Sequence, residues 1–291
     1  MSEVLEILNP SYVLRNALYG GVLTGMILPL IGILMYARRM IFLGVTLPHL
    51  SATGIAVAIF WHLTFHEQTP IHSDFLMALL GSTVLTTGTL VFLATLERRG
   101  RGLVEGRIGA VYILAGAVTI LLLASERIPE VGVIQLLRGQ IIAISDADMV
   151  VLLISFSLVG VMLWFFRKEL LLVSVDRDLA LSMGKKVWAW DLLLYALAGL
   201  TISLGVLMVG PLLTFAFVLL PPMIAFRLAT RFQVVPLMAV ILGAFIAFSG
   251  FIISYEFDWP TGPTDALIGC ILLGLVTVIQ WLGCRFRRME R

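Results

Sequence analysis

Long apolar runs dominate the chain, and short polar segments separate them. The runs 108–124 and 149–166, for example, contain no charged residue. Their lengths suit an α-helix that crosses a hydrocarbon core roughly 30 Å thick. Strands of a membrane barrel would instead alternate apolar and polar residues over about ten positions. The pattern therefore predicts an all-α, polytopic membrane protein.

One apolar stretch, residues 192–226, is too long for a single crossing. It carries no charge, and as one helix it would measure about 52 Å. Gly210-Pro211 interrupts it, and proline cannot continue the helical hydrogen-bond ladder. We therefore expect two short legs, and eight or nine transmembrane helices depending on whether one leg is re-entrant. The expected spans are 12–36, 42–63, 75–96, 105–124, 148–166, 190–208, 211–228, 233–255 and 264–283.

Composition and charge indicate a membrane setting and an orientation. Hydrophobic residues make up 60% of the chain and charged residues 13%, against about 25% charged in soluble domains. With the N-terminus outside, all Lys and Arg residues except Arg15, Arg127 and Arg138 fall on the inner side, as the positive-inside bias requires. We predict one transmembrane domain over 1–291, in a bacterial-type cytoplasmic membrane, with a cytoplasmic C-terminus. The apolar segment 131–145 suits a helix on the outer surface.

Several motifs of energy-coupled or catalytic proteins are missing from the sequence. It has no G-x-x-x-x-G-K-[ST] phosphate loop, and neither H-E-x-x-H nor G-x-S-x-G occurs, so neither P-loop ATP binding nor these hydrolytic chemistries is expected. The expected spans hold almost no ionisable group at mid-depth, whereas proton-coupled carriers normally need one. The chain is therefore expected to be a transport subunit and not an enzyme, with its energy supplied by another chain.

The inner loop of about 168–188 has the signals of a short helix. Asp176 is a suitable N-cap, Asp178 favours the first turn, and Gly184 is a suitable C-terminal stop. These positions predict a helix of about two turns over 177–183. Two interpretations remain open: an ordinary loop at the lipid headgroups, or a coupling helix that docks on a cytoplasmic motor. The apolar side chains that this helix would expose are Val175, Leu179 and Met183.

Five short motifs occur in a distinctive order. They are Arg38-Arg39-Met40 followed by 44–51, the segment 139–145, the pattern Ser174, Asp176, Ala180 and Gly184, the run 209–213 with Ala216 and Pro221, and the segment 258–264. Together these motifs, over about residues 20–282, resemble the permease family of ABC importers for zinc, manganese and iron. The resemblance implies a type II importer permease fold, paired as a homodimer or with a related permease.

The resemblance also implies partners and a role for the inner loop. Cytoplasmic ATP-binding subunits would hydrolyse ATP, and an extracytoplasmic metal-binding protein would deliver a divalent metal ion, with no bound cofactor and no nucleic acid involved. A permease for a metal chelate, siderophore or B12-like cargo and a stand-alone secondary carrier are the alternatives. In this reading the residues that couple to the ATPase are Val175, Asp176, Asp178, Leu179, Met183 and Gly184.

The second span departs from the family pattern. The family carries an aspartate and a histidine four residues apart, on one helix face; here His49 occupies the histidine position and Val45 the carboxylate position. His49 would then be a single weak metal contact helped by thioethers such as Met26 or Met208, or a partner permease would supply the aspartate, or the cargo is not a free ion. A packing role for His49 is the remaining alternative.

The outer end of this span carries the other histidines. His62 and His66 are four residues apart, and His72 follows with Glu67 and Asp74 nearby. Imidazole and carboxylate groups in this number would suit a transition metal. A polar turn at the membrane surface is the alternative interpretation.

Overall fold

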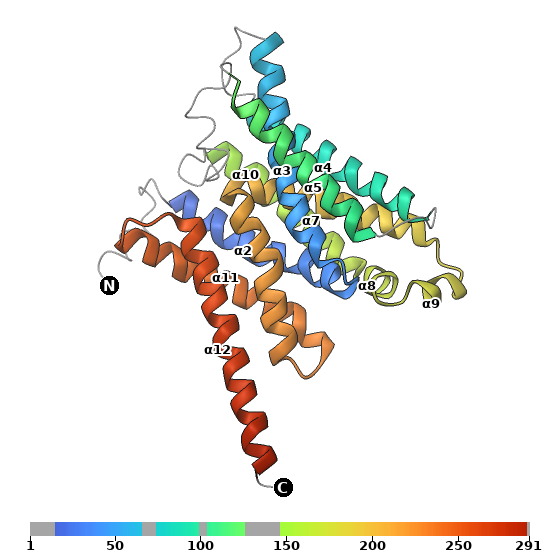
Figure 1. The fold of residues 1–291 in the computed structure, drawn as a ribbon, viewed down its shortest axis with the longest axis vertical. Helices are drawn as coiled ribbons and strands as arrows, with labels where there is room; N and C mark the ends of the chain where they lie inside the picture. The colour runs from blue at the N-terminus through green and yellow to red at the C-terminus, as the bar shows by residue number, and fades with distance from the viewer. Residues whose placement is uncertain (1–14, 66–73, 99–103, 126–145, 290–291) are drawn as a thin grey trace.

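The computed structural model describes residues 15–65, 74–98, 104–125 and 146–289. Every regular element in these ranges is helical (Figure 1). The predicted surface helix at 131–145 lies outside the described residues. The helices, in chain order, are α2 (Arg15–Ala37), α3 (Ile41–Phe65), α4 (Asp74–Arg98), α5 (Val104–Leu123), α7 (Asp146–Phe165), α8 (Arg167–Val175), α9 (Arg177–Ser182), α10 (Val187–Leu228), the 3-10 turn η3 (Phe232–Val234), α11 (Val235–Glu256) and α12 (Thr261–Met289).

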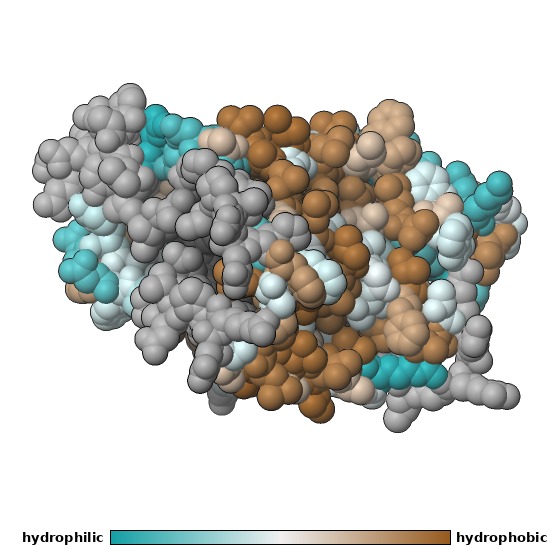
Figure 2. All heavy atoms as spheres, turned by 90° about the horizontal axis from the view of Figure 1, so that it is seen from above, coloured by the Kyte–Doolittle hydropathy of each residue, from teal (hydrophilic) through white to brown (hydrophobic). Residues whose placement is uncertain are grey.

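Eight of the described helices are long and apolar enough to cross a membrane, with α10 counted once. Figure 2 shows a broad hydrophobic band across the middle of the molecule and hydrophilic residues toward its two ends. A lipid-facing belt of this kind is what a helical membrane protein needs, because lipid solvates apolar side chains and no exposed backbone. The predicted all-α polytopic fold is confirmed.

The long helix α10 consists of two legs that fold back on each other. Its backbone breaks at Gly210 (φ 80°, ψ 166°), a conformation open to glycine only. A β-carbon placed on Gly205 would lie 3.1 Å from Oγ1 of Thr214, whereas nine residues of straight helix span about 13 Å. The predicted division into two legs around Gly210-Pro211 is therefore confirmed.

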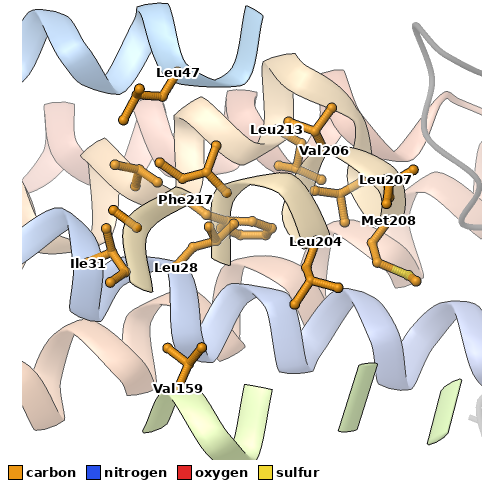
Figure 3. Close-up of a cluster of buried hydrophobic side chains, with 14 of the residues drawn as sticks. Leu28, Ile31, Leu47, Val159, Leu204, Val206, Leu207, Met208, Leu213 and Phe217 are labelled. Carbon is orange, nitrogen blue, oxygen red and sulfur yellow. The ribbon is translucent and has the colours of Figure 1, made fainter. Parts of the chain in front are cut away.

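Close backbone contacts bring α2 into the centre of the bundle. A β-carbon on Gly25 would lie 2.7 Å from the carbonyl oxygen of Gly243 in α11, and one on Gly32 would overlap the carbonyl of Val218 in the second leg of α10. Small residues allow helices in membranes to approach this closely. Figure 3 shows the resulting core, in which side chains from α2, α3, α7 and both legs of α10 form one buried cluster.

Two features differ from the sequence-based expectation. Residues 167–175 form the helix α8, where only a loop was expected. The last helix begins at Thr261 and not near residue 264, because Pro263 is tolerated in the first turn of a helix. Asp265 lies inside α12, is only 5% exposed, and packs against Gly250 of α11.

Candidate translocation and coupling sites

The short helix α9 is closed at both ends by specific hydrogen bonds. The Asp176 side chain accepts from the Leu179 amide at 2.9 Å, which makes it the predicted N-cap. At the other end Gly184 has φ 72°; its amide donates to the Leu181 carbonyl, and the next amide donates to Ala180. These two bonds form a Schellman motif, which ends a helix at a left-handed glycine. The predicted helix and both of its caps are confirmed.

One face of α9 packs inward and the other is exposed. Ala180 is fully buried with Val173 and Val187 in a small cluster of their own. Val175, Leu179 and Met183 are 64%, 48% and 60% exposed. Figure 1 shows α8 and α9 at the edge of the bundle opposite the beginning of α2. The structure thus brings the six predicted coupling residues together on one compact projection.

A buried ion pair, which the sequence did not reveal, joins this projection to the long helices. Arg38, just after α2, places Nη2 2.8 Å from Oδ1 of Asp191 in α10, and both side chains are at least nine-tenths buried. Its Nε donates to Ser174 Oγ at 3.1 Å, and its Nη1 donates to the Tyr195 hydroxyl at 3.3 Å. Nη2 of Arg177, the first residue of α9, lies 3.4 Å from the second Asp191 oxygen. The only signal in the sequence was Asp191's position at the border of the uncharged stretch 192–226.

His49 lies on α3, one turn after Val45, and is half-buried. Its Nδ1 is 3.1 Å from the Val45 carbonyl oxygen, and its ring centroid is 4.8 Å from that of Tyr112 in α5. A proton on Nδ1 would make the first contact a hydrogen bond and leave the Nε2 lone pair to bind a metal. Met208 is fully buried in the core, while Met26 is 37% exposed.

The histidines do not gather into one site in the part of the chain that the structure describes. His62 is thirteen residues beyond His49 on α3, which separates the two by about 20 Å along the helix. His66 and His72 lie outside the described residues. Among the residues described, no three His, Cys, Asp or Glu side chains come together as a possible metal site, so His49 is a solitary imidazole here.

The chain is similar to known transport proteins over nearly its whole length. It is 25% identical to the manganese transport system membrane protein MntC of Halalkalibacterium halodurans, with 98% of this chain and 96% of that one covered. It is 26% identical to the high-affinity zinc uptake system membrane protein ZnuB of Haemophilus influenzae, with 89% and 95% covered. Its fold matches that of PsaBC from Streptococcus pneumoniae, solved in complex with a Fab, at a TM-score of 0.79, 22% identity and 94% coverage of each chain.

The family model described as ABC 3 transport family matches residues 11–280. This covers seven of the eight candidate spans and the α8–α9 projection in full, and the last span, Thr261–Leu282, except for its two final residues. A subunit of an ABC transporter is not a stand-alone carrier, so that alternative is not supported. The missing phosphate loop agrees with the family, because ATP hydrolysis in these transporters belongs to a separate chain. This protein belongs to the ABC 3 transport family and is the multi-pass membrane permease of an ABC transporter.

Proposed function

We propose that this chain forms one half of the membrane path of an importer for a divalent transition metal: Mn²⁺, Zn²⁺ or Fe²⁺. The observation that carries the proposal is the family match over residues 11–280, together with full-length similarity to proteins named for manganese and zinc transport. A second permease copy, identical or related, would complete the path. Cytoplasmic ATP-binding subunits would drive it, and an extracytoplasmic binding protein would supply the metal.

In this proposal α9 is the element that docks on the ATP-binding subunit. Exposed apolar surface lies on and beside it: Leu179 within α9, Val175 at the end of α8 and Met183 just after α9. Such surface commonly marks a protein interface. The two caps hold these side chains in a defined arrangement. Lys185 and Lys186 follow at once, and the positive-inside bias supports a cytoplasmic location for this end, with the N-terminus outside.

His49 is the proposed contact for the metal within the membrane. An ionisable residue inside a membrane span is a functional-site candidate in its own right. Val45 lies one helical turn away and provides no carboxylate, so binding by His49 alone would be weak and the ion would pass readily. Two alternatives are that the partner permease adds a ligand or that the metal crosses as a chelate; the experiment tests the second of these.

Metal accumulation in cells that express the complete operon tests the proposal. We expect His49→Ala to lower uptake severalfold at unchanged protein abundance, and Val45→Asp to raise binding of the free ion by adding a carboxylate on the same face of α3. Val57→Ala, at an exposed site on α3, is the matched control. Accumulation that does not depend on the permease would overturn the importer proposal. Uptake that requires a chelator would identify a chelate as the cargo, and unchanged uptake by His49→Ala would leave His49 as packing.

A further inference from the structure

Three charged residues connect the exposed projection to the membrane helices, and we call them the ionic joint: Arg38, Asp191 and Arg177. Asp191 is at its centre, because each of its two carboxylate oxygens faces a different guanidinium group. Arg38 comes from the corner after α2, Asp191 from the first leg of α10, and Arg177 from the first turn of α9. The joint therefore links the corner after α2 with two consecutive helices, α9 and α10, that come much later in the chain.

The joint has an inner and an outer contact. The inner contact, Arg38 to Asp191, is 2.8 Å long and at least nine-tenths buried, and Arg38 is also held by Ser174 and Tyr195. A buried pair of this kind behaves as a fixed unit, because removing either partner leaves an uncompensated charge. The outer contact, Arg177 to Asp191, is 3.4 Å long, and the Arg177 side chain is 41% exposed.

The inner contact is rigidly connected to the centre of the bundle. Arg38 follows α2 directly, and α2 touches the second leg of α10 at Gly32 and α11 at Gly25. Arg39 has φ 58° and turns the chain into α3. A displacement applied to Asp191 is thereby shared by α10 and by the corner between α2 and α3.

We propose that Arg177 is a positioning residue that transmits the movement of α9 to α10 and α2 through Asp191. This inference rests on the proposed docking of α9 on the ATP-binding subunit. Two other features connect α9 to its surroundings: its capped backbone, and the packing of Ala180 against Val173 and Val187. The Arg177 contact adds a direct ionic connection from α9 to the transmembrane helix α10. Glu169 and Lys185, 3.9 Å apart, tie α8 to the end of the projection but reach no transmembrane helix.

The test uses the complete transporter, with its ATP-binding subunits, in liposomes and with the binding protein supplied. We expect Arg177→Gln to co-purify normally with the ATP-binding subunits and to keep basal ATP hydrolysis. The metal taken up per ATP hydrolysed should fall about two- to fivefold, the factor that a partly exposed ion pair contributes to an equilibrium. Arg177→Lys, which keeps the charge, should restore most of the ratio. Lys186→Gln, at an exposed basic site between α9 and α10, should leave the ratio unchanged.

The possible outcomes are distinct. An unchanged ratio for Arg177→Gln would overturn the inference. Loss of ATP-binding subunits from Arg177→Gln would also overturn it, since Arg177 would then act in docking itself. Leu179→Asp is the separate check of the proposed function: if it leaves co-purification intact, then the docking role of α9 fails, whatever Arg177 does.

Discussion

The N-cap of α9 offers the sharpest test of how the transporter is coupled, through the variant Asp176→Ala. The helix has six residues, and isolated helices of that length are unstable in water. Three interactions therefore stabilise α9: the hydrogen bond from the Leu179 amide to the Asp176 side chain at 2.9 Å, the Schellman hydrogen bonds at Gly184, and the packing of buried Ala180. Removing the cap acceptor leaves the exposed apolar side chains in place but weakens the helix that arranges them.

The size of the effect follows from the cap alone. Replacing an N-cap Asp by Ala typically costs about 1 kcal/mol, and about 1.4 kcal/mol corresponds to a factor of ten in an equilibrium constant. If only the ordered helix binds, then the dissociation constant of the ATP-binding subunit should rise by up to about fivefold. Asp176→Asn should bind like the wild type, since asparagine caps as well as aspartate does.

The assay is a titration of purified permease with the ATP-binding subunit in detergent, with the thermal midpoint of each permease variant measured in parallel. Asp178→Asn is the matched control: it removes the same charge from the first turn of α9 but leaves the cap. We expect it to change the affinity less than Asp176→Ala does. Equal weakening by Asp176→Asn and Asp176→Ala would show that charge matters and the cap does not. Wild-type affinity for Asp176→Ala would refute docking through an ordered α9.

Two further predictions concern the transmembrane helices. Gly210→Ala should lower the thermal midpoint in detergent, because φ 80° and ψ 166° cost a residue with a β-carbon about 1–3 kcal/mol. Gly274→Ala, where a β-carbon would meet nothing within 4 Å, should leave the midpoint unchanged. Equal midpoints for the two variants would disprove the argument. Gly250→Ala should destabilise by about 1–3 kcal/mol through overpacking, since its methyl group would overlap the Asp265 carboxylate. The double variant with Asp265→Ala should recover part of that loss, and strict additivity of the two single effects would contradict direct contact.

The sequence predicted those features that depend on near neighbours or on the solvent. Lipid imposes a minimum length on each span and requires continuous apolar residues, so the spans could be placed from the pattern alone. The fold-back at Gly210 and the helix α9 were predictable because proline, glycine and a capping aspartate act within a few residues. The start of α12 was predicted three residues too late, because Pro263 is equally compatible with a loop and with the first turn of a helix.

The ionic joint could not be predicted in this way. Arg38 and its hydroxyl partners are 136 and 157 positions apart in the chain, and no local pattern specifies which acid an isolated arginine meets. From the sequence alone, Arg38 is one of the basic residues of the inner side, where it would satisfy the positive-inside bias without any partner. The packing of α2 against α10 brings Arg38 to Asp191. Burial of the pair then makes the Arg38 charge part of the structure, because an unpaired charge there would be costly.

The same corner places the joint close, along the backbone, to the proposed metal contact. Arg38 is followed by the left-handed turn at Arg39, and α3 begins at Ile41. His49 is eight residues into that helix, about 12 Å from its start. The helix α3 runs from Ile41 past His49 with Pro48 inside it, so we expect a rotation of the corner at Arg38 to reach His49 across that proline. Coupling through the joint would then need no chain of intermediate contacts, since one helix connects the corner at Arg38 to the proposed metal contact.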